Sequence, residues 1–81
     1  MAKVKIYVTS KEGILDPQGK AVEASLHSLG YRQVSNVKIG KYIELEIEIK
    51  DPAKRDEIIN EMCRKLLANP VIEDYRYEIA D

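Results

Sequence analysis

The hydrophobic positions of this chain follow two periods, one typical of strands and the other of helices. Residues 3–9 and 42–50 alternate strictly between apolar side chains and charged, tyrosine or threonine side chains. A period of two with many β-branched residues predicts half-buried strands. Weaker alternation at residues 34–39 and 71–79 predicts two more strands, the first joined to residues 42–50 by a short turn at Gly40-Lys41.

Apolar residues recur at helical spacing in the two long intervals between these strands. Each interval begins with Asp-Pro, at residues 16–17 and 51–52, where the carboxylate can cap a helix and the proline suits its first position. Gly30 is placed to end the first helix in a left-handed conformation. Pro70 must end the second, because proline disfavours helix at the residue before it. The predicted apolar faces are Ala21, Val22, Ser25, Leu26 and Leu29 on the first helix, and Ile58, Ile59, Met62, Cys63, Leu66 and Leu67 on the second.

The resulting order, βαββαβ, predicts one α+β domain over residues 1–81. We expect a ferredoxin-like fold, with a four-stranded antiparallel sheet and two helices on one face. The first and third strands would then be neighbours. Pairing Lys3 with Glu48 places Tyr7 opposite Glu44, makes one face of the sheet apolar and lines the other with opposite charges.

Composition narrows the classes of function. The 81 residues include 13 Lys and Arg against 14 Asp and Glu, a net charge of −1, which does not favour a nucleic-acid surface. The single Cys63 excludes an internal disulfide and any CxxC pair. No stretch is apolar enough to span a membrane, and the N-terminus does not resemble a signal peptide, so we expect a cytoplasmic protein. A chain this short has a small core, which favours self-association.

The residues capable of chemistry do not form a convincing catalytic set. A Cys63–His27 nucleophile pair would need the two helices to touch, and Cys63 in an apolar stripe is more typical of a core residue. Glu44, Glu46 and Glu48 could bind a cation or act as an acid/base pair, but they have predicted lysine partners. Gly19-Lys20 lacks the rest of a phosphate loop, although the helix start could bind an anion.

Tyr7 and Tyr42 are predicted on the face of the sheet that carries no helix, where RNA-binding domains of this topology stack bases. The glutamates on the same face would repel phosphate. An open sheet face on a small chain favours instead an interaction module or a subunit, with the tyrosines, the charged ladder and the edge strands as the contact surface.

Four strings give the chain a specific resemblance: VTSKEGILDPQGKAV at 8–22, SLGY at 28–31, VKIGKYIEL at 37–45 and CRKLLANPVIEDY at 63–75. In this order and length they resemble the PurS family, the small subunit of phosphoribosylformylglycinamidine synthase. The resemblance implies a non-catalytic role in purine biosynthesis. The chain would bridge a glutaminase subunit that releases ammonia and a synthetase subunit that uses ATP and Mg to activate formylglycinamide ribonucleotide. It would form homodimers or higher oligomers, support ammonia transfer, and hold no cofactor or metal of its own.

The resemblance also points to residues that contact other subunits or hold the loops that do so, with a purely structural role as the alternative for each. The candidates are Tyr7, which is taken from the open face of the sheet, and Asp16, Pro17, Gly19, Lys20, Gly40, Lys41, Tyr42, Asn69, Pro70 and Asp74. The alternative function is a stand-alone interaction or small-molecule-sensing module of the same fold.

Overall fold

The computed structural model describes residues 1–80, which form three strands and two main helices. In chain order these are β1 (Ala2–Ser10), α1 (Pro17–Ser28), β2 (Lys41–Ile47), α2 (Pro52–Met62) with a π-helical turn η1 (Cys63–Leu67), and β3 (Glu73–Ala80). The strands make one antiparallel sheet in the order β2-β1-β3. No helix within the described residues is long and apolar enough to cross a membrane.

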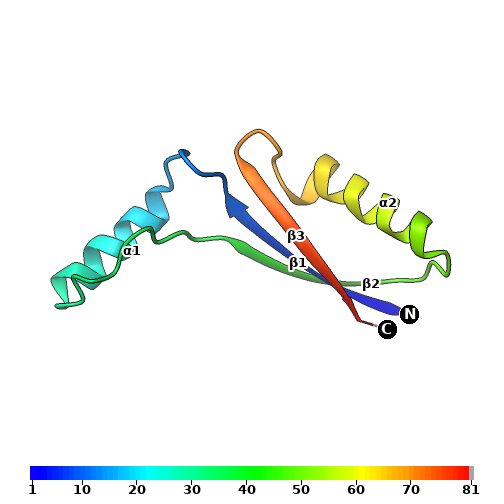
Figure 1. Ribbon diagram of the computed structural model, residues 1–81, viewed down its shortest axis with the longest axis horizontal. Coiled ribbons are helices and arrows are strands. Elements are labelled where there is room, and N and C mark those ends of the chain that lie inside the picture. Colours follow the sequence, from blue (N-terminus) through cyan, green and yellow to red (C-terminus); the bar gives the residue numbers. More distant parts are fainter. Residues whose placement is uncertain (81) are drawn as a thin grey trace.

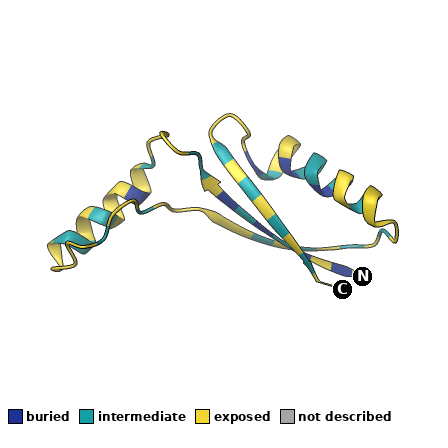
Figure 2. Cartoon of the chain, in the orientation of Figure 1, coloured by how far each residue is buried: buried dark blue, intermediate teal, exposed yellow. Residues whose placement is uncertain are grey.

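The core lies between the central strand and the second helix. Val4, Ile6 and Val8 of β1 alternate with polar positions and are buried against Ile59 and Cys63. Figure 2 shows the buried, dark blue segments mainly along β1 and along α2 with the turn that follows it, and one more near the start of α1. A period-two strand and a helical stripe thus bury their apolar sides against each other, as the sequence predicts.

Both predicted helix starts are confirmed. Asp16 and Asp51 accept hydrogen bonds from the backbone N–H groups of Gly19 and Ala53, and a proline follows each aspartate. The end of α1 is a Schellman motif in which Gly30 has φ +101. The second helix ends at Leu67, before Asn69-Pro70, after the wider turn in which the Ala68 N–H donates to the Cys63 carbonyl at 2.9 Å.

The prediction of a four-stranded sheet is wrong for this chain, because residues 34–39 form no strand. Asn36 has φ +56, a left-handed conformation that interrupts extended backbone. Backbone groups of this segment are bonded to side chains of the α1 region instead of a neighbouring strand: the Ile39 N–H donates to Asp16 at 2.9 Å. Gly40-Lys41 therefore makes no hairpin turn and simply leads into β2.

The expected place of the first helix is also wrong. Figure 1 shows α1 projecting from the sheet with residues 31–40 running back along it, while α2 lies at the opposite side. The molecule measures 50 × 25 × 15 Å. In α1 the predicted apolar face is mostly exposed, with Leu29 at 73%. The residues of α1 that are partly or fully covered are Gly19, Glu23, Leu26 and His27.

The predicted strand register is wrong by two residues, although both faces are correct. Lys3 lies opposite Glu46, and Tyr7 opposite Tyr42. A shift of two keeps every side chain on its face. The observed register brings two tyrosine rings together and places Gly40 against β1, where an added Cβ would lie 2.2 Å from the Val8 carbonyl oxygen.

The two later predicted strands are shorter than expected. Residues 48–50 lie outside β2, and β3 begins at Glu73, two residues after the predicted start. Val71 is 77% exposed, so it does not share the buried side of Tyr75 and Tyr77. Residues 71 and 72, which the alternation assigned to the strand, belong to the turn after Pro70.

We expect Ile59→Ala to lower the free energy of unfolding by about 2–5 kcal/mol, because Ile59 is fully buried and its truncation leaves a cavity. The matched control is Lys54→Ala, on an exposed position of the same helix, with a change within about 0.5 kcal/mol. Urea unfolding at one fixed protein concentration measures both. Equal midpoints for the two variants would contradict the assigned core.

Candidate subunit interface

The start of α1 is the most closely built feature outside the core. Asp16 caps the helix through Oδ1, which accepts the Gly19 N–H at 2.9 Å, and its Oδ2 accepts the Ile39 N–H at 2.9 Å. Gly19 is buried, and a Cβ there would lie 2.2 Å from the Val37 carbonyl oxygen. We call Asp16, Gly19, Val37 and Ile39 the brace. These two hydrogen bonds hold the pKa of Asp16 below its ordinary value of 3.8, the bond from Gly19 having the larger effect.

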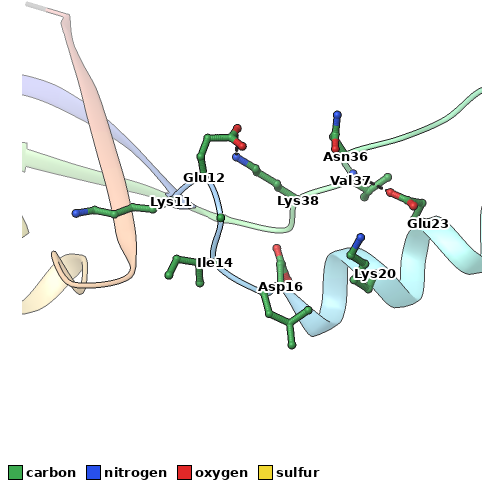
Figure 3. Close-up of a pocket in the computed structure, with 11 residues that line it drawn as sticks. Lys11, Glu12, Ile14, Asp16, Lys20, Glu23, Asn36, Val37 and Lys38 are labelled. Atoms are coloured by element: carbon green, nitrogen blue, oxygen red, sulfur yellow. Dashed lines mark hydrogen bonds and ion pairs between the residues drawn. The ribbon is translucent and has the colours of Figure 1, made fainter.

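A cleft of about 200 Å³ lies beside the brace. Figure 3 shows its charged side chains, with Glu12 and Lys38 joined across it. Their Oε1 and Nζ atoms are 2.8 Å apart, and this contact lowers the pKa of Glu12. Lys20 is exposed near the cleft. Positive and negative side chains alternate around the cleft, and the Asp16 carboxylate already accepts a hydrogen bond from the backbone at the start of α1. The cleft therefore does not favour the binding of an anion.

The open face of the sheet carries a second cluster. The rings of Tyr7 and Tyr42 are 5.2 Å apart, and the Arg76 guanidinium lies 4.0 Å from the centre of the Tyr7 ring. The Tyr42 hydroxyl donates to Glu44 at 2.7 Å, which raises the pKa of Tyr42 to about 12 and lowers that of Glu44. Tyrosine and arginine are enriched at protein interfaces. Arg76 is not among the candidates that the sequence indicates, although it shares the parity of Asp74 on β3.

The turn before β3 forms the third group. The Asn69 carbonyl accepts the N–H groups of Ile72 and Glu73 at 3.1 and 2.7 Å, while the Asn69 N–H donates to the Glu73 carboxylate. The Asn69 side-chain oxygen accepts the Val71 N–H at 3.1 Å. Pro70 stands inside this turn, where its missing N–H costs no hydrogen bond.

The candidate residues named from the sequence therefore lie in three places and not in one site. Asp16, Pro17, Gly19 and Lys20 form the start of α1. Tyr7, Lys41 and Tyr42 lie on paired stretches of β1 and β2, with Gly40 just before them; Asp74 lies opposite Thr9 on the other side of β1. The N–H of Lys11 donates to the Ile72 carbonyl at 2.9 Å and joins the end of β1 to the third group, Asn69 and Pro70.

The two nucleophile candidates are not brought together. Cys63 is buried in the core at the start of η1, and burial raises the pKa of its thiol. His27 is on the projecting α1, where its Nε2 lies 2.7 Å from the Val34 carbonyl oxygen. Both residues have structural roles here. Within residues 1–80 no cluster of three or more His, Cys, Asp or Glu could hold a metal ion.

Known proteins match this chain along its whole length. The PurS family model, described as phosphoribosylformylglycinamidine (FGAM) synthase, matches residues 3–81. The chain belongs to the PurS family. A curated PurS relative from Bacillus subtilis (strain 168) is 58% identical over 81 residues, which cover 100% of this chain and 95% of the relative. One from Synechocystis sp. is 52% identical over 93% of this chain and 75% of its own length. Both are described as phosphoribosylformylglycinamidine synthase subunit PurS.

Solved PurS structures have the same shape. The C2 crystal form of B. subtilis PurS superposes with a TM-score of 0.90 and covers 100% of both chains at 58% identity. A chain from the structure of PurLQS from Thermotoga maritima superposes with a TM-score of 0.85 at 33% identity, covering 98% of this chain and 96% of that one. An extended form with α1 off the sheet therefore belongs to the PurS fold.

The brace has a pH signature. The pKa of Asp16 is lowered in the folded chain, so its contribution to stability is present above the ordinary value of 3.8 and is lost as pH falls below it. We expect the wild-type chain to lose more stability between about pH 5 and pH 3 than Asp16→Asn, which cannot titrate. Thermal unfolding across this range measures the difference. Parallel pH profiles for the two proteins would contradict the assigned hydrogen bonds.

Proposed function

We propose that this chain is the non-catalytic small subunit that joins the glutaminase and synthetase subunits of phosphoribosylformylglycinamidine synthase. Membership of the PurS family over residues 3–81 carries the proposal. The PurLQS structure, which contains a chain of the same shape, supports a role inside a three-component assembly. In the proposed assembly a glutaminase subunit releases ammonia and a synthetase subunit consumes ATP with Mg. This chain supplies contact surfaces and assists ammonia transfer in the cytoplasm.

We further propose that a second copy of the chain completes the fold. A compact domain of this length has a radius of gyration of about 12 Å, whereas this chain has 16.1 Å. A ferredoxin-like fold lays two helices side by side on one face of the sheet, and among the elements of residues 1–80 only α2 lies there. The chain alone therefore leaves half of the core side uncovered.

An apolar groove of about 440 Å³ marks the uncovered half. Leu45 of β2 lines it together with Ile58, Met62 and Leu66, and Leu66 is 83% exposed. Its neighbours on the core side of β2, Ile43 and Ile47, are only half-buried. This is the side of the sheet that a first helix would cover in a ferredoxin-like fold.

The projecting α1 has the matching surface. Val22 and Leu29 lie one above the other on its outer side and are 38% and 73% exposed. The neighbouring segment 34–39 has strand-like alternation, and β2 has a free edge because it is the end strand of the sheet. In the proposed dimer each chain places α1 on the groove of its partner and residues 34–39 beside the partner's β2. The two-fold exchange restores a four-stranded sheet with two helices on one face.

The self-association has a direct test. Val22→Asp places a charge on the outer side of α1 and is expected to raise the dimer dissociation constant by about tenfold or more, since a buried unpaired carboxylate is strongly unfavourable. Ala24→Asp, on another side of the same helix, is the control and should dimerise as the wild type does. Sedimentation equilibrium measures both. A monomeric wild-type chain, or equal dissociation constants, would contradict the exchange.

The subunit role is tested by reconstitution. Purified chain alone should show no turnover, whereas its addition to the glutaminase and synthetase subunits should restore glutamine-dependent synthesis of formylglycinamidine ribonucleotide. Synthesis driven by added ammonium salt is the internal control for the synthetase subunit. Unchanged glutamine-dependent synthesis after addition would refute the assignment. A melting temperature raised by a free nucleotide or amino acid would favour the alternative sensing module.

A further inference from the structure

Asp16 makes more hydrogen bonds than a helix cap requires. One carboxylate oxygen is sufficient to cap α1, and Oδ1 does so at 2.9 Å from the Gly19 nitrogen. The other oxygen accepts from Ile39, 23 residues away, also at 2.9 Å. The same side chain thus ties the start of α1 to the segment that runs back to the sheet.

Gly19 explains how close the two segments come. Glycine inside a helix is less favourable than alanine, and the φ of Gly19 is not left-handed. What requires glycine is space, since a Cβ would lie 2.2 Å from the Val37 carbonyl oxygen, a backbone atom that cannot turn aside. The brace therefore closes only with glycine at this position.

Other contacts make α1 and the returning segment into one unit. The Val37 N–H donates to Glu23 at 3.4 Å, and His27 contacts the Val34 carbonyl oxygen at 2.7 Å. Toward the sheet, Gly40 lies against the backbone of β1 with no room for a side chain. We call residues 11–40 the arm. Its two connections to the sheet meet at the brace, and Figure 3 shows Asp16 on one of them and Val37 on the other.

We propose that Asp16 and Gly19 are positioning residues, which hold the arm at one direction from the sheet so that α1 reaches the groove of the second copy. This rests on the proposed self-association. An arm without the brace would be tethered to the sheet by residues 11–15 and 39–40 without a fixed direction. Dimerisation would then have to order it, and that ordering weakens binding. The two residues act on assembly from inside the chain and do not themselves contact the partner.

The test compares Gly19→Ala with Ser28→Ala, an exposed position at the other end of α1. Both substitutions raise helix propensity. Gly19→Ala should nevertheless raise the dimer dissociation constant by about tenfold, whereas Ser28→Ala should leave it unchanged. Circular dichroism checks that α1 is retained, and sedimentation equilibrium measures the dimer. A Gly19→Ala chain that dimerises as tightly as the wild type would overturn the proposal.

Hydrogen exchange at Ile39 provides a second readout that a simple helix cap would not change. Its N–H should be protected in the wild type, exposed in Asp16→Ala, and intermediate in Asp16→Asn, since an amide has only one oxygen acceptor. Equal exchange in all three chains would overturn the brace. If Gly19→Ala does not fold, hydrogen exchange in the Asp16 variants still tests whether the brace forms. A wild-type chain that protects Ile39 but stays monomeric would refute the second copy, and with it the role of the brace in assembly.

Discussion

The burial of one side of β1 is the interaction on which the rest of the structure depends. This strand is central in the sheet and hydrogen-bonded on both edges, and its residues Val4, Ile6 and Val8 are at most 1% exposed. They are covered by α2 and η1, through Ile59 and Cys63. Every other element is attached to this small centre: β2 and β3 by strand pairing, and α1 by the connections at either end of the arm.

A core this small cannot bury all of the apolar surface of the chain. Within residues 1–80, apolar residues of the α1 region such as Val22 and Leu29 remain exposed, and the core side of β2 is only half-buried. In an ordinary compact domain the two surfaces would meet. Here the brace directs α1 away from its own sheet, so the unused surfaces become available to another chain. In the proposed dimer the same association would give the subunit both stability and a contact surface.

The candidate residues show where sequence patterns are reliable. Helix caps, turn prolines and the strings shared with the PurS family indicated Asp16, Gly19 and Asn69 as candidates. All three stabilise local structure, through backbone hydrogen bonds or through the close approach of two backbone segments. The sequence did not indicate Arg76, because an arginine on the polar side of an alternating strand has the pattern of any solvent-exposed charged residue. Its stacking on Tyr7 depends on the pairing of β3 with β1, which no local pattern encodes.

The helix boundaries, the faces of the strands and the family could be predicted from the sequence, because these follow from short-range periodicity, capping and strings of adjacent residues. The register of β2, the conformation of residues 34–39 and the place of α1 could not. Those depend on atoms far apart in the chain: the Tyr7–Tyr42 contact, the approach of Gly40 to β1, and the bond from Ile39 to Asp16. Alternation made residues 34–39 look like a strand, but a strand also needs a neighbour, and only the tertiary structure shows that this chain does not supply one within residues 1–80.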